Sequence, residues 1–150
     1  MAMSFLSYQR RMMYQLLFWA GLSLGVGLPM TLSTREWVRA FGGMTAAWAA
    51  VNALIALLAL RGVRKKAQQN ADAATIEGWV RQLLRLLWIN VALDALYIAV
   101  GVGLIVAVPE NRMLSGFGWA IVVQGAFLLM FDAWHGMRLR HFPRGFTPSA

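Results

Sequence analysis

The chain has 150 residues, of which 59% are hydrophobic and only 13% charged, with a mean hydropathy of +0.57. A soluble domain carries about 25% charged residues, so this composition argues against a water-soluble domain and for a protein dissolved in a bilayer. The net charge of +8 does not indicate a nucleic-acid binder, because the basic residues flank apolar segments, and the lack of cysteine excludes disulfides, iron–sulfur clusters and cysteine nucleophiles.

Four apolar segments follow one another along the chain, at residues 12–34, 40–60, 86–109 and 113–136. A helix of about 20 residues crosses a hydrocarbon core roughly 30 Å thick. Lipid cannot satisfy open backbone groups, so each segment is expected to be a helix. We therefore predict an all-α fold, a four-transmembrane-helix up-down-up-down bundle. It forms a single integral membrane domain over residues 1–150, with helices at about 12–32, 40–66, 75–108 and 114–138.

The stretch between the second and third apolar segments, residues 61–85, is longer and mixed in character. Asp72 or Thr75 can cap a helix there, and apolar residues follow at helical spacing. We expect a cytoplasmic helical hairpin extension between the second and third helices, turning near residues 68–71. The tail at residues 141–150 contains two prolines and is expected to be flexible.

The basic residues predict the orientation of the bundle. Eleven of the 14 lysines and arginines lie on the side of the N-terminus and the central loop, and Arg35, Arg39 and Arg112 lie on the other. This bias predicts a multi-pass protein of the cytoplasmic (inner) membrane with both termini in the cytoplasm. Arg10 and Arg11 before an apolar run also resemble a secretory signal, but a run of this length favours a retained first helix. Four basic side chains of the central loop are predicted to contact anionic lipid headgroups: Arg61, Arg64, Lys65 and Lys66.

Polar residues inside the apolar segments are the strongest candidates for a site, because burying them in lipid is costly. Counting at 1.5 Å per residue from the basic ends puts Asn52 and Asp94 about 13 Å deep, near the midplane. Asn90 and Tyr97 lie on the same helix face as Asp94. We predict an intramembrane polar cluster of Asn52, Asn90, Asp94 and Tyr97, with Asn52 within direct or one-water reach of Asp94. Its members either join the helices by hydrogen bonds or form a proton- or ion-coupling site.

A second candidate lies near the end of the fourth segment. Asp132 and His135 are three residues apart and are predicted to form an interfacial pair. His135 is also a candidate axial ligand for a pigment or haem. The chain offers too few ligands for a dedicated metal site, and no metal or cofactor is expected.

Small residues predict where helices approach closely. Gly21 and Gly25 form a GxxxG pattern, and Gly101 offers a similar surface on the third helix. A shift of 76 residues superposes residues 25–28 on 101–104 and residues 41–42 on 117–118. The chain is therefore a candidate for two copies of a two-helix repeat.

Three strings of the sequence resemble those of a small, uncharacterised family of bacterial four-helix integral membrane proteins, to which no activity is assigned: FGGMTAAWAAVNALIALLAL, LLWINVALDALYIAVGVGLIV and GFGWAIVVQGAFLLMFDAWHG. The resemblance covers most of residues 15–136. It implies the four-helix topology and leaves the activity open. The matching positions are Trp48, Asn52, Leu93, Asp94, Tyr97, Gln124, Gly125, Phe131 and Asp132.

No phosphate-binding loop, Ser–His–Asp set or zinc-protease motif occurs, so we expect a non-enzymatic protein. The first hypothesis is an accessory or scaffold subunit of a larger membrane assembly or homo-oligomer. Its expected partners are the lipid bilayer and other membrane subunits or a second copy of itself, with no nucleic acid. The alternative is a small proton- or ion-coupled transporter that uses Asp94, and the second alternative is pigment or haem binding through His135.

Overall fold

The computed structural model describes residues 2–141 and is all-helical over that range. Its four helices are α1 (Ala2–Met30), α2 (Glu36–Ala67), α3 (Ala73–Ala107) and α4 (Arg112–Arg140). Each of them is long and apolar enough to cross a membrane. The expectation of four such helices is therefore confirmed. Most of the predicted flexible tail, from residue 142 onward, lies outside the described residues.

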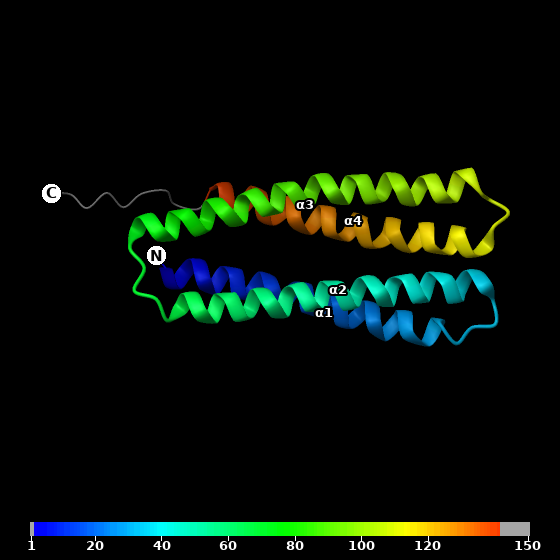
Figure 1. The fold of residues 1–150 in the computed structure, drawn as a ribbon, viewed down its shortest axis with the longest axis horizontal. Helices are drawn as coiled ribbons and strands as arrows, with labels where there is room; N and C mark the ends of the chain where they lie inside the picture. The colour runs from blue at the N-terminus through cyan, green and yellow to red at the C-terminus, as the bar shows by residue number, and fades with distance from the viewer. Residues whose placement is uncertain (1, 142–150) are drawn as a thin grey trace.

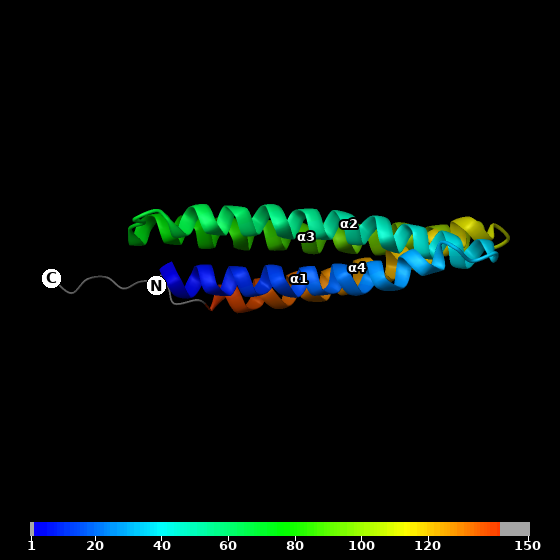
Figure 2. The ribbon, with the colours of Figure 1, turned by 90° about the horizontal axis from the view of Figure 1, so that it is seen from below.

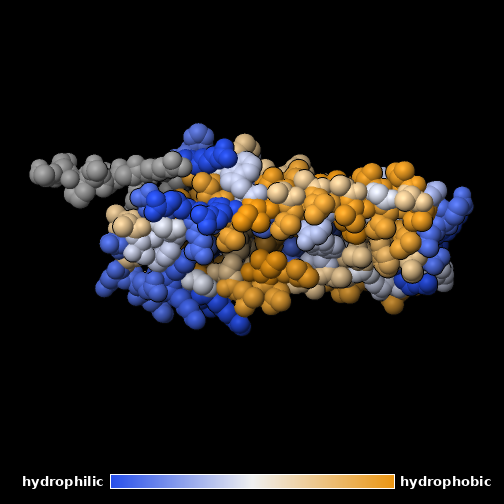
Figure 3. All heavy atoms as spheres, turned by 45° about the horizontal axis from the view of Figure 1, so that its top comes forward, coloured by the Kyte–Doolittle hydropathy of each residue, from blue (hydrophilic) through white to orange (hydrophobic). Residues whose placement is uncertain are grey.

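The helices lie side by side along the long axis of the molecule (Figures 1 and 2). α1 packs most closely on α2, and α3 packs most closely on α4, so the chain forms two helical hairpins. The beginning of α1 and the α2–α3 connection lie at one end (Figure 1). We name this the basic end, because many hydrophilic side chains gather there. Apolar side chains cover most of the visible surface beyond it, up to a smaller hydrophilic region at the far end (Figure 3). The opposite end, with the α1–α2 and α3–α4 connections, is the loop end.

α1 begins at Ala2, about ten residues earlier than the sequence predicted. The prediction was wrong because it began the helix after Arg10 and Arg11, at the first residue of the apolar run. Phe5 and Leu6 before that point are buried in the same core as Met12. A helix continues past the end of its apolar run wherever one of its faces still has a packing partner.

Two side chains define where later helices begin. Asp72 accepts a hydrogen bond from the backbone N–H of Thr75 at 2.8 Å, so the structure selects Asp72 of the two predicted caps. Asn111 caps α4 in the same way, through a 3.0 Å bond from the N–H of Leu114. Both are typical N-cap residues that satisfy an open backbone donor.

Glycines bring each hairpin into backbone contact near the loop end. A β-carbon at Gly27 would lie 2.8 Å from the carbonyl oxygen of Gly42, and one at Gly101 would lie 2.8 Å from that of Gly118. Both contacts are reciprocal, at 2.6 Å in the other direction. No larger residue fits at these four positions without moving a backbone. The two helices of each hairpin are therefore joined by the same kind of glycine contact.

The prediction for Gly101 agrees with this geometry, but the prediction for Gly21 and Gly25 does not. A β-carbon on either of these two glycines would meet nothing within 4 Å, because both lie on the exposed side of α1. The contact residue of α1 is instead Gly27, two residues beyond the position that the 76-residue shift pairs with Gly101. Gly42 and Gly118 keep the register of that shift.

Candidate functional site

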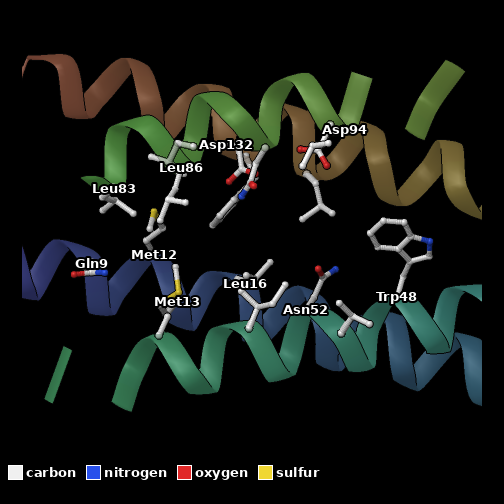
Figure 4. Close-up of a pocket in the computed structure, with 18 of the residues that line it drawn as sticks. Gln9, Met12, Met13, Leu16, Trp48, Asn52, Leu83, Leu86, Asp94 and Asp132 are labelled. Carbon is white, nitrogen blue, oxygen red and sulfur yellow. The ribbon is translucent and has the colours of Figure 1, made fainter. Parts of the chain in front are cut away.

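A cavity of about 380 Å³ lies between the two hairpins, in the half of the bundle toward the basic end (Figure 4). All four helices contribute to its lining. Its exposed lining residues come from α2 and α3, so the cavity opens between these two helices. The residues at this mouth are Val51, Ile55, Leu86, Asn90, Leu93 and Tyr97.

Two carboxyl groups face each other in this cavity. Asp94 of α3 is 4% exposed and Asp132 of α4 is 7% exposed. Their side chains lie close enough to interact, and Asp132 also lies close to the Asn90 side chain. Gly125 of α4 lies close against α3 at this level, since a β-carbon there would lie 3.0 Å from Cγ1 of Ile98 and 3.4 Å from the carbonyl oxygen of Asp94. The sequence predicted Asp94 as a site residue but put Asp132 with His135 instead.

Three buried polar atoms of the cavity-lining residues have no hydrogen-bond partner among the described residues. They are Oδ2 of Asp94, Nδ2 of Asn52 and Oε1 of Gln9, and Asn52 is only 3% exposed. Asn52 points into the cavity from α2, while Asp94 and Asp132 reach it from the opposite hairpin (Figure 4). No direct hydrogen bond joins Asn52 to Asp94 among the described residues, and the alternative of one-water reach stays a prediction. The hairpins stand apart at this level and leave both groups facing the cavity.

Tyr97 occupies a different place from the predicted one. Its ring packs edge-on against Trp48 of α2, with ring centroids 5.1 Å apart, and its hydroxyl makes no described hydrogen bond to Asp94. The two rings line the cavity at its end nearer the loop end. Asn90 lines the cavity as well, so all four members of the predicted cluster border one space without forming one hydrogen-bonded network.

The predicted Asp132–His135 pair is not formed. Asp132 faces α3, whereas His135 faces α1, where Tyr8 Oη lies 2.7 Å from Nδ1 and Gln15 Oε1 lies 3.1 Å from Nε2. Residues three apart on a helix differ by about 60° in direction, enough to face different neighbours. Both ring nitrogens of His135 are engaged in these contacts, so the geometry does not favour an axial ligand to a pigment or haem.

A polar contact that the sequence did not predict joins α1 to α4. Gln124 is almost fully buried, accepts a 2.9 Å hydrogen bond from Nε1 of Trp19 and donates a 3.2 Å bond to Oγ of Ser23. Trp19 also stacks on Phe127, with ring centroids 3.8 Å apart. Gln124 stood out in the sequence as a polar residue within an apolar segment, but its partners could not be identified there.

The basic residues of the α2 terminus lie at the basic end. Arg64 lines a cleft of about 230 Å³ together with Arg10 of α1. Lys66 lies over the ring of Trp79, 5.0 Å from its centroid, and Arg61 and Lys65 are exposed. The predicted headgroup contacts of these four side chains stay predictions.

Within residues 2–141, no group of three or more His, Asp or Glu side chains is arranged to hold a metal ion. A family model of unknown function, DUF6992, matches residues 15–133. The chain belongs to DUF6992. The match includes Asn52, Asp94 and Asp132 but not the first cavity-lining residues of α1, Gln9, Met12 and Met13. No curated protein and no solved structure matches this DUF6992 chain.

Proposed function

We propose that this DUF6992 protein is a non-enzymatic, small proton-coupled transporter of the cytoplasmic (inner) membrane. One observation carries the proposal, the burial of two neighbouring carboxyl groups, Asp94 and Asp132, at a cavity that all four helices line. Buried carboxyl groups in a membrane helix are costly and commonly belong to proton or ion pathways. A sealed bundle with Asp94 bonded to Asn52 would have favoured a structural role instead.

In the proposed arrangement the chain crosses the membrane four times in up-down-up-down order, with both termini and the α2–α3 hairpin in the cytoplasm. The excess of lysine and arginine at the basic end supports this orientation. The cavity then lies in the cytoplasmic half of the bundle. On the other side the two hairpins meet at Gly116 of α4, where a β-carbon would lie 2.6 Å from the carbonyl oxygen of Trp37 of α2. In this proposal the arrangement is one state of an alternating-access cycle.

The carboxyl pair supplies the coupling element. Two ionised carboxylates are both acceptors, so Asp94 and Asp132 can hydrogen-bond to each other only when one of them carries a proton. Two like charges at contact also repel each other, which favours sharing a single proton. The pair thus holds one proton at the wall of the cavity, where a solute can exchange with it.

Infrared spectroscopy tests this element. The pH-difference spectrum of the purified protein is expected to contain a carboxylic-acid band that shifts or disappears in both Asp94→Asn and Asp132→Asn, because the proton is shared. Glu77→Gln is the matched control, since Glu77 pairs with Arg81 on the surface at 3.4 Å and lies outside the cavity. A band unchanged in both aspartate variants would contradict the proposal.

A second candidate function is the accessory or scaffold subunit, and a surface groove favours it. A groove of about 840 Å³ runs along α1 and α4 and exposes apolar side chains, including Phe18, which is 76% exposed. Met130 and Trp134 continue the groove on α4. Purification in a mild detergent distinguishes the candidates, because a subunit brings down its partner or forms a defined oligomer, whereas a self-sufficient transporter is active without one.

A further inference from the structure

We propose that the cavity binds an organic cation with an apolar body and exchanges it for the proton of the Asp94–Asp132 pair. This inference rests on the proposed function and names the class of solute. Among the residues that the structure describes, the two aspartates are the only charged side chains that line the cavity. A solute that enters this low-dielectric space is therefore selected for positive charge.

The rest of the lining is apolar or aromatic, which favours an organic cation over a metal ion. Trp48, Tyr97 and Phe131 border the cavity, and aromatic faces attract organic cations. Met12 and Met13 add flexible, polarisable surface. A hard metal ion needs six or more oxygen ligands, and no group of three acidic or histidine side chains lies together within residues 2–141.

The unpartnered atoms indicate where the solute makes its polar contacts. Oδ2 of Asp94 is buried and without a partner, and it faces the same space as the side-chain amide of Asn52. A buried polar atom left unpaired costs stability unless a ligand satisfies it. The cavity volume of about 380 Å³ falls within the range of small-molecule sites.

The mouth of the cavity indicates how such a solute enters. It lies between α2 and α3, and the exposed side chains there are mostly apolar, such as Ile55 and Leu93, with Asn90 and Tyr97 as the polar exceptions. In the proposed membrane orientation this opening faces lipid. An amphiphilic cation concentrated in the bilayer therefore reaches the carboxyl pair laterally.

Charge balance defines the exchange. The pair holds one proton and one negative charge without the solute. When the cation binds beside Asp94, its positive charge favours the doubly ionised pair, and the proton leaves for solvent. The net change is one cation bound and one proton released. The only covalent bond that breaks is the O–H bond of the carboxyl pair, and its proton passes to water.

The test measures binding of tetraphenylphosphonium by equilibrium dialysis of the detergent-solubilised full chain, with tetraphenylborate as an anion of the same shape. Titration calorimetry in two buffers of different ionisation enthalpy counts the protons released. We expect tetraphenylphosphonium to bind with release of up to about one proton and to bind up to about tenfold more tightly per unit rise in pH. Tetraphenylborate should not bind above the micelle background.

Variants identify the site. Asp94→Asn is expected to weaken tetraphenylphosphonium binding by about tenfold or more. Asp94→Glu, which keeps the charge, should retain binding and proton release, and Glu77→Gln should match the native chain. If Asp94→Asn fails to elute as a folded protein, Trp48→Leu replaces it, with weaker binding expected from loss of the aromatic face.

The outcomes separate the two proposals. If tetraphenylborate binds as well as tetraphenylphosphonium, or if neither Asp94→Asn nor Trp48→Leu weakens binding, the cation inference is overturned. If the infrared carboxyl band responds to both aspartate substitutions but no cation binds, the cation inference fails and the proton-binding function stands. If cation binding depends on Asp94 but releases no proton at any pH, the solute class stands and the proton coupling fails.

Discussion

The loop-end half and the cavity half of the bundle are built from the same two hairpins, yet they pack in opposite ways. Toward the loop end, backbones touch within each hairpin at Gly27–Gly42 and Gly101–Gly118, and the two hairpins touch where Gly116 meets Trp37. Toward the basic end, side chains hold the hairpins apart around a cavity that contains Asp94 and Asp132. Small residues stabilise a membrane bundle by close backbone contact, whereas buried polar groups without partners destabilise it. We infer that the loop end fixes the helices and the cavity half carries the function.

The largest effect is expected from adding one methyl group at a glycine contact. Gly118→Ala would place a β-carbon 2.6 Å from the carbonyl oxygen of Gly101, so α3 and α4 must separate. Overpacking of this kind costs about 1–3 kcal/mol. The free energy of unfolding in mixed micelles, measured by denaturant titration, should fall by that amount, and Gly27→Ala should have a similar effect in the other hairpin.

Two neighbouring glycines provide matched controls. Gly103→Ala and Gly25→Ala each lie two residues from a contact glycine, and an added β-carbon meets nothing within 4 Å at either place. Both variants should be as stable as the native chain or slightly more stable, because alanine favours a helix. Equal destabilisation by contact and control variants would refute the assignment of the closing contacts.

The next effect concerns the polar contact between α1 and α4. Gln124→Leu leaves Nε1 of Trp19 and Oγ of Ser23 without their partner. Interhelical hydrogen bonds in membranes contribute about 0.6–1.7 kcal/mol each, so we expect a loss of about 1–2 kcal/mol in the same unfolding assay. A more stable Gln124→Leu variant would contradict this, because the desolvation of the buried amide would then exceed the stabilisation from its two hydrogen bonds.

A smaller effect of opposite sign is expected in the cavity half. Asn52→Leu removes a buried amide whose Nδ2 has no described partner, so stability should rise by about 1 kcal/mol, while binding of the cation probe weakens. Thr45→Val is the matched control on α2, because its Oγ1 is also buried and unpartnered but lies outside the cavity lining. This control should gain stability and keep binding, so any loss of binding in Thr45→Val would contradict the distinction.

The smallest effect is expected at Asp72, which caps the first turn of α3 away from both the glycine contacts and the cavity. Hydrogen bonds from the side chain and backbone of Thr75 hold the pKa of Asp72 below its usual value of 3.8. The cap therefore stabilises α3 fully above that value, and the stabilisation is lost as the pH falls through the lower pKa of the folded state. Asp72→Ala should speed hydrogen exchange in the first turn of α3 at neutral pH, with no change at the loop end. The difference from the native chain should shrink in strong acid.

The sequence predicted those features that depend on one helix at a time. Long apolar runs predict the four helices, and the cost of burying a carboxylate correctly predicts that Asp94 lies inside. Features that depend on how two helices face each other were not predictable. Gly25 and Gly27 are alike in sequence, and only the rotation of α1 decides which of them meets Gly42. The partner of Asp132 likewise depends on the facing of α4, which spacing along one helix does not determine.

The central claim is that the Asp94–Asp132 pair exchanges a proton for a cation. Cation uptake into proteoliposomes, driven by a pH gradient, tests it most directly. Vesicles with an acidic interior and a clamped membrane potential are mixed with labelled tetraethylammonium, which crosses lipid slowly. We predict uptake that requires the pH gradient, is lost in Asp94→Asn and is unchanged in Glu77→Gln. Gradient-driven uptake that persists at the native rate in Asp94→Asn would contradict the account.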